Sequence, residues 1–108
     1  DFNIDVPTCR LRDFLDTEVD LLKIDIEGAE TTVLKDCQEN LINVKNIFIE
    51  YHSYREEKQT LQEILIILTN NGFRYYIERI GFAFKHPFID DKKELYFDLQ
   101  LNIYGYKV

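Results

Sequence analysis

Apolar and polar residues alternate along this chain with two different periods, which predicts both helices and strands. Spacings of three and four residues predict amphipathic helices over 29–40 and 56–70, and a shorter helical segment from Thr8 to Leu15. Residues 81–94 follow neither period, and we expect them to form a long hairpin loop. Apolar runs and two-residue alternation predict four strands, over 20–27, 45–52, 73–80 and 95–106.

The order of these elements predicts a mixed α/β sheet. Strands that are separated by helices join through right-handed crossovers and run parallel. The last strand follows another strand with no helix between them, so we expect it to run antiparallel. Its apolar residues alternate with polar ones, which is typical of a half-buried strand that is antiparallel or at an edge. These apolar residues are Phe97, Leu99, Leu101 and Ile103.

The strand at 20–27 carries charges where a buried strand usually carries apolar residues. Lys23, Asp25 and Glu27 share one face of it, because side chains alternate along a strand. Asp25 and Glu27 lie at its carboxyl end, and ligands bind beyond the carboxyl ends of strands in sheets of this kind. The charges therefore predict a ligand site at this end of the strand.

Two further ionisable residues, Glu50 and His52, lie at the carboxyl end of the strand at 45–52. If the two strands are neighbours, these residues converge with Asp25 and Glu27 on one edge of the sheet. Lys23 lies deeper along its strand, and an isolated buried charge is costly. We therefore expect Lys23 to be buried with Glu50 as its partner.

The composition is that of one folded domain, and it disfavours several classes of protein. A net charge of −7 with no basic stripe disfavours nucleic-acid binding. No apolar run approaches the roughly 20 residues of a membrane span, and we find no signal-peptide pattern. Cys9 and Cys37 lack the spacing of a metal site or a disulfide framework, so we expect buried thiols in a reducing, cytoplasmic setting.

The segment LKIDIEGAE at residues 22–30, followed by IEYH at 49–52, resembles the FkbM family of S-adenosylmethionine-dependent methyltransferases. The upstream PTCRLRDFL and the helix that ends in NNGF are similar to this family too, so the resemblance covers nearly the whole chain. It implies a three-layer, Rossmann-like methyltransferase sheet from the fourth strand onward, with parallel strands and a C-terminal antiparallel strand. It also implies O-methylation of a small-molecule acceptor such as a sugar or secondary metabolite.

Methyltransferases of this class hold their cofactor with a glycine-rich turn, which this sequence lacks. Its four glycines include no Gly-x-Gly turn between a strand and a helix. We therefore expect residues 1–108 to be the C-terminal half of a class I methyltransferase-like domain. The resemblance implies S-adenosylmethionine as the cofactor of the full-length enzyme, and we expect this chain alone neither to bind it nor to turn over.

Four residues receive roles from this resemblance and from their places at strand ends, each with a structural alternative. Asp25 is predicted to act as a base or to orient the substrate; alternatively it pairs with Lys23 or caps the next helix. Glu27 binds substrate, or its charge stabilises the helix N-terminus. His52 is a candidate general base, or a surface residue. Glu50 lines the substrate site, or it only pairs with Lys23.

Two neighbouring residues receive structural interpretations. Gly28 is expected to permit a sharp turn from strand to helix. Glu30 lies in the first helical turn, where the helix dipole explains an acidic residue without any function. A divalent ion held by the four site candidates is a weaker alternative, because the resembled family is not marked by a metal site.

The rival interpretation is a non-catalytic α/β module that keeps the fold and binds a partner or dimerises. An uncovered strand edge tends to pair with another chain. We therefore expect the strand at 20–27 to mediate self-association, or to pair with a part of the protein upstream of it.

Overall fold

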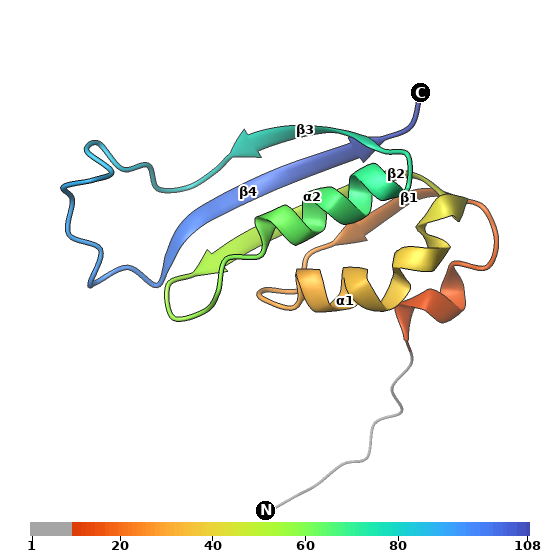
Figure 1. The fold of residues 1–108 in the computed structure, drawn as a ribbon, viewed down its shortest axis with the longest axis horizontal. Helices are drawn as coiled ribbons and strands as arrows, with labels where there is room; N and C mark the ends of the chain where they lie inside the picture. The colour runs from red at the N-terminus through yellow and green to blue at the C-terminus, as the bar shows by residue number, and fades with distance from the viewer. Residues whose placement is uncertain (1–9) are drawn as a thin grey trace, which may run out of the picture.

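The computed structural model describes residues 10–108, which form a four-stranded sheet and its helices (Figure 1). All four predicted strands and both longer predicted helices are confirmed, while the helix start predicted at Thr8 lies outside the described residues. In chain order the elements are η1 (Leu11–Phe14), β1 (Val19–Ile24), α1 (Glu30–Cys37), η2 (Gln38–Asn43), β2 (Val44–Tyr54), α2 (Leu61–Asn70), β3 (Arg74–Arg79) and β4 (Phe97–Tyr106).

The strands lie in the order β1-β2-β4-β3. β1 and β2 are parallel, with Ile24 opposite Ile49, and β4 is antiparallel to both of its neighbours. The predicted antiparallel direction of the last strand is therefore confirmed. β4 lies inside the sheet, so its alternating pattern does not come from an edge position.

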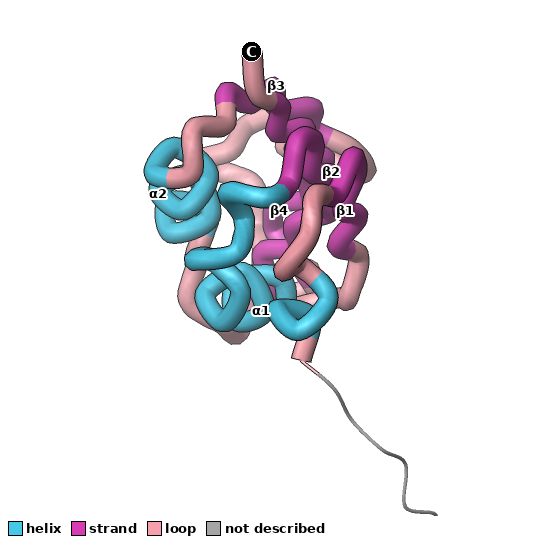
Figure 2. The backbone as a smooth tube through the Cα atoms, turned by 90° about the vertical axis from the view of Figure 1, so that its right-hand side faces the viewer, coloured by secondary structure: helices cyan, strands magenta, loops and turns pink. Residues whose placement is uncertain are grey.

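Both α-helices pack on the same face of the sheet, and the side view shows the helices on one side and the strands on the other (Figure 2). Residues 10–108 thus form two layers, and the predicted third layer is not present among them. Each fully buried aliphatic side chain contributes about 1.5–3 kcal/mol. The main buried residues of this core are Ile24, Leu34, Cys37, Ile47, Ile49, Tyr51, Ile64, Ile67, Leu68, Leu101 and Ile103.

The opposite face of the sheet carries no helix among the described residues, and we call it the open face. Cross-strand pairing aligns Lys23, Phe48, Tyr104 and Tyr76 on it. The Phe48 and Tyr104 rings meet edge to face with their centroids 5.1 Å apart, and the Tyr76 ring lies 6.0 Å from that of Tyr104. Leu21 is 63% exposed on β1. An apolar surface of this kind is more typical of an interface than of a solvated sheet.

β1 is shorter than predicted, since it ends at Ile24 and not at residue 27. The chain then leaves the sheet and turns with φ of +20° at Glu27 and +93° at Gly28. Backbone with positive φ cannot continue a strand. The sharp turn predicted at Gly28 is therefore confirmed, and it begins one residue earlier.

α2 begins at Leu61, later than the predicted start near residue 56. Ser53, a residue type that often caps helices, instead lies within β2 and is buried. The helix stops as predicted at Asn71 and Gly72, where Gly72 has a φ of +84°. None of the helices in residues 10–108 is both long and apolar enough to cross a membrane.

Lys23 is exposed, so the predicted buried pair with Glu50 is wrong. Its Nζ atom lies 5.7 Å from the centroid of the Phe48 ring. Glu50 instead accepts a hydrogen bond from Nε2 of Gln100, at 2.9 Å. Lys23 keeps its charge in water beside the aromatic ring, which avoids the cost of burying an ammonium group.

Cys37 is fully buried in α1, as the sequence predicted. Burial raises the pKa of its thiol to about 11. The thiol is therefore protonated at neutral pH and packs as a small apolar group. Cys9, the other predicted buried thiol, lies outside the described residues.

Gly105 of β4 is packed against β2, and this contact leads to a first prediction. A Cβ atom at this position would lie 2.5 Å from Cγ2 of Ile47. We expect Gly105→Ala to lower the free energy of unfolding by about 1–3 kcal/mol, because an added methyl overpacks the core. Urea unfolding measures the loss. In the double variant with Ile47→Ala the loss should be smaller than the sum of the single losses; additive losses would contradict the contact.

Candidate functional site

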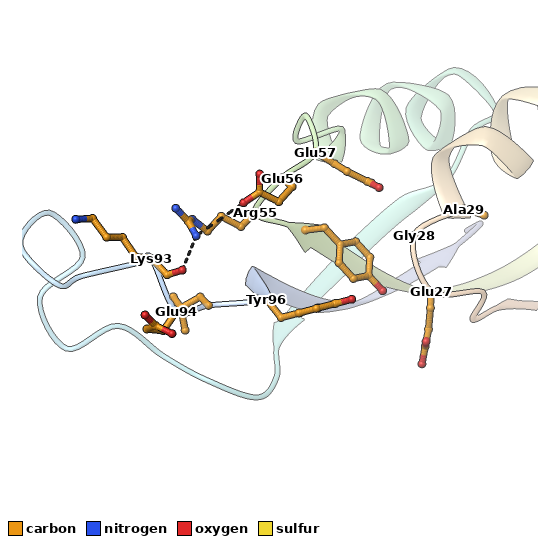
Figure 3. A pocket seen from close by; sticks show the side chains of 11 residues that line it. Glu27, Gly28, Ala29, Arg55, Glu56, Glu57, Lys93, Glu94 and Tyr96 are labelled. Carbon is orange, nitrogen blue, oxygen red and sulfur yellow. Dashed lines mark hydrogen bonds and ion pairs between the residues drawn. The ribbon is translucent and has the colours of Figure 1, made fainter.

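The candidate site is a pocket of about 750 Å³ at the carboxyl edge of the sheet (Figure 3). Three segments line it: residues 27–29 after β1, residues 54–57 at the end of β2, and residues 93–96 before β4. Neighbouring parallel strands both end here, and ligand sites in open α/β sheets form at such ends. A cavity therefore lies at the edge of the sheet where the sequence predicts a ligand site.

The turn after β1 forms one wall of this pocket. Glu27 is the one non-glycine residue with positive φ in residues 10–108. A Cβ atom on Gly28 would lie 3.0 Å from Cε2 of Tyr54, so the tyrosine ring rests against bare backbone. Strained backbone of this kind persists only where the surrounding structure holds it, and it is frequent at functional sites.

Tyr54 and Tyr96 form the aromatic part of the wall. Their rings are 6.0 Å apart and meet edge to face. Burial, followed by the negative charges of Glu27 and Glu30, raises the pKa of the Tyr54 hydroxyl above its usual value. The hydroxyl therefore stays protonated at neutral pH and is available as a hydrogen-bond donor.

Arg55 ties the third segment to the end of β2. Its backbone N–H donates to the carbonyl of Tyr96 at 3.2 Å, and its guanidinium donates to the carbonyl of Lys93 (Figure 3). The same guanidinium lies 3.8 Å from the carboxylate of Glu56. Arg55 thus has its backbone amide and one guanidinium nitrogen engaged, and the carboxylates of the lining outnumber its cations. A ligand that offers hydroxyl or cationic groups suits this lining.

The ring of His52 stacks near Tyr54, with the centroids 6.0 Å apart, and its side chain is only 7% exposed. One carboxylate oxygen of Glu30 accepts the backbone N–H of His52 at 3.1 Å and lies 3.4 Å from Nδ1 of the ring. Glu30 is itself 2% exposed. β1 has already ended at this level, so the Glu30 carboxylate takes the amide that a longer β1 would have paired.

Glu50 lies on the other side of the imidazole. Its Oε1 is 3.7 Å from Nε2 of His52, and it accepts the hydrogen bond from Gln100. The amide nitrogen of Gln100 is also 3.3 Å from the same ring nitrogen. The predicted meeting of Glu50 and His52 is therefore present, with Gln100 of β4 between them.

Asp25 and Glu27 open onto two different cavities. Glu27 belongs to the pocket described above, whereas Asp25 lines a second pocket of about 840 Å³ beside the free edge of β1. Leu11, Val33 and Asp36 also line this second pocket. The four predicted site residues thus lie at one end of the sheet but not around one point.

The metal alternative has no geometric support in residues 10–108. No group of three or more histidine, cysteine, aspartate or glutamate side chains there is placed to hold a metal ion. Divalent ions need several such ligands at once. The four site candidates do not supply them in the described structure.

Sequence reasoning missed three residues of this region. The dipole interpretation of Glu30 overlooked that its carboxylate turns inward to β2. Its place after the Gly28 turn was the available signal, because a turn this tight brings the first helical residue back against the neighbouring strand. Tyr54 and Tyr96 gave no such signal, since aromatic residues are common in strands.

The contact between Gly28 and Tyr54 leads to a second prediction. We expect Gly28→Ala to lower the free energy of unfolding by about 1–3 kcal/mol, because of its positive φ and the crowded ring. Urea unfolding gives the loss, and the amide spectrum should show shifts at Tyr54. Gly72→Ala is the matched control: its φ is similarly positive, but an added Cβ meets nothing within 4 Å. Equal losses in the two variants would show that the ring contact is unimportant.

The sequence of this region matches a known protein family. Residues 1–75 match the Methyltransferase FkbM domain, which is well over half of the 108 residues. Comparisons with curated proteins and with solved structures found no match. The matched part contains β1, the Gly28 turn, α1, β2 and α2, and so most of the pocket wall. The chain therefore belongs to the FkbM methyltransferase domain family.

Proposed function

We propose that this chain is the substrate-side half of an S-adenosylmethionine-dependent methyltransferase that methylates a hydroxyl of a small molecule such as a sugar or secondary metabolite. The observation that carries the proposal is the pocket at the carboxyl edge, built on the family's own strand-to-helix turn at Glu27 and Gly28. Its carboxylates and tyrosines suit a ligand rich in hydroxyl groups.

In this proposal, some residues of the chain bind the acceptor and others transfer its proton. S-adenosylmethionine supplies an activated methyl group when it is bound. Glu27 accepts hydrogen bonds from acceptor hydroxyls, and the neutral Tyr54 hydroxyl donates one. His52, which borders a smaller cavity that adjoins this pocket, takes the hydroxyl proton, and Oε1 of Glu50 lies 3.7 Å from its Nε2. Asp25 lines the separate second pocket, so it is not assigned this step. Held geometry of this kind supplies a large share of the rate.

The cofactor does not fit residues 10–108 by themselves. They contain no glycine-rich turn between a strand and a helix that would cradle it. The free edge of β1 and the open face indicate where further structure would pack. We infer that the cofactor site is completed by a part of the protein outside this chain, and that 1–108 is the C-terminal half of the domain.

This proposal yields a third prediction, on cofactor binding. S-adenosylmethionine is titrated calorimetrically into this chain and into a version from the same gene that is extended at its N-terminus. We expect heat of binding only with the extended chain, because only that version would carry the glycine-rich turn. If the chain alone binds, the half-domain interpretation is wrong. If neither binds, the methyltransferase proposal itself is overturned.

A second candidate function, a non-catalytic dimerisation module, is favoured by the unpaired edge of β1. β1 is the terminal strand of the sheet, and Leu21 is exposed on it. Strands of this kind pair readily with a second copy. The two functions differ in what covers the edge, which is an upstream segment in the enzyme and another copy of the chain in the module.

The fourth prediction concerns this edge. If the edge mediates self-association, sedimentation velocity should show a concentration-dependent dimer that Leu21→Lys removes. A lysine on an edge strand opposes pairing by its charge. Ile66→Lys is the matched control, since Ile66 is 57% exposed on α2, away from the edge. A monomer at all concentrations, or a dimer that Leu21→Lys leaves intact, would rule out the dimerisation module.

A further inference from the structure

His52 is held between two carboxylates, and only one arrangement of its ring proton fits them. Nδ1 faces the buried Oε1 of Glu30 at 3.4 Å. Nε2 faces the amide nitrogen of Gln100 at 3.3 Å, and Oε1 of Glu50 at 3.7 Å. Each ring nitrogen of a neutral imidazole is either a donor or an acceptor, so its neighbours decide the tautomer.

The neighbours of Nδ1 require a donor there. A carboxylate oxygen is an acceptor, so an unprotonated Nδ1 would place its lone pair against that of Glu30. The neighbours of Nε2 require an acceptor, because the Gln100 amide nitrogen donates and carries a second hydrogen beyond the one given to Glu50. Both sides of the ring therefore select the form with hydrogen on Nδ1.

A second observation indicates that Glu30 does more than stabilise the start of α1. Its Oε2 atom is buried and has no hydrogen-bond partner among the residues that the structure describes. Burying a carboxylate with one oxygen unsatisfied is costly. Glutamine would satisfy the His52 backbone N–H equally well through its carbonyl. What only the acid adds is negative charge beside the Nδ1 hydrogen.

We propose that Glu30 is the positioning residue of a proton-accepting site whose acceptor atom is Nε2 of His52. The inference rests on the proposed function, because there the proton comes from the hydroxyl of the methyl acceptor. The hydroxyl O–H bond breaks, a new N–H bond forms at Nε2, and the electron pair of the broken bond stays on the oxygen, which becomes the nucleophile. The resulting imidazolium carries hydrogen on both ring nitrogens, with Nδ1 facing Glu30 and Nε2 lying 3.7 Å from Oε1 of Glu50.

The site is reached from the open face and from the smaller cavity beside it. Glu50 and Gln100, the neighbours of Nε2, are partly exposed on the open face. A cavity of about 260 Å³ also borders His52, and it shares Tyr54 and Gly28 with the main pocket. An acceptor hydroxyl that displaces the Gln100 amide would meet the Nε2 lone pair directly.

The fifth prediction is the tautomer itself, measured on this chain without cofactor. In long-range ¹H–¹⁵N spectra of the neutral imidazole, we expect His52 Nδ1 to carry the hydrogen and Nε2 to show the shift of an unprotonated nitrogen. His86 is an internal reference, because it lies exposed in the loop before β4 and its ring should show the mixture of a free imidazole. Hydrogen on Nε2 of His52 would overturn the proposal.

Two variants separate positioning from structural support. Glu30→Gln keeps an acceptor for the His52 backbone N–H but loses the charge. The population of the Nδ1-protonated form should therefore fall measurably, although the Gln100 amide still favours it. Glu50→Gln is the matched control and should leave the tautomer unchanged, since its oxygen is too far from Nε2 for a hydrogen bond. A Glu30→Gln variant that folds and retains the tautomer would show that Glu30 only supports β2. If the variant does not fold, the tautomer of the unmodified chain still decides.

These outcomes are independent of cofactor binding. The extended chain could bind S-adenosylmethionine while His52 carries its hydrogen on Nε2, which would overturn the Glu30 proposal alone. Conversely, the predicted tautomer with no cofactor binding in either version would leave the proton-accepting site intact and overturn the methyltransferase proposal.

Discussion

β2 continues past the point where its parallel neighbour β1 stops, and the buried carboxylate of Glu30 occupies the place that β1 leaves. A buried backbone N–H must find an acceptor, so the longer strand is stable only with a polar group in that place. Glu30 follows Gly28 by only two residues, so the turn at Glu27 and Gly28 brings its carboxylate into that place. The Glu30 side chain thus replaces a strand as the hydrogen-bond partner of β2. The pocket, the start of α1 and the surroundings of His52 all depend on this replacement.

One consequence is that structural and chemical demands meet in the same residues. The turn needs positive φ at two successive positions, and the second is glycine, against which the Tyr54 ring packs. Tyr54 in turn contacts the ring of His52 and borders the pocket. A change in the turn is therefore expected to displace both the aromatic wall and the imidazole. This coupling exists even though the four predicted site residues do not surround one point.

A second consequence concerns what lies on the other side of the sheet. With both α-helices on one face, the row formed by Phe48, Tyr104 and Tyr76 is left in contact with solvent in residues 10–108. The edge of β1 is unpaired as well. Apolar side chains and open strand edges both favour association. In the proposed enzyme the upstream half of the domain would cover them, and in the alternative module a second copy would.

The order and type of the elements, the edge that holds the candidate site and the family could all be predicted from the sequence. Hydrophobic periodicity reports which side of each element is buried, and the segment from Leu22 to Glu30 is distinctive enough to identify the family. Three facts could be learned only from the folded chain: Lys23 is exposed, Asp25 and Glu27 open onto separate cavities, and Glu30 is turned inward against His52. All three depend on where β1 ends relative to β2. A strand's length is set by its partner and by the turn that follows, and no local pattern in either strand records it.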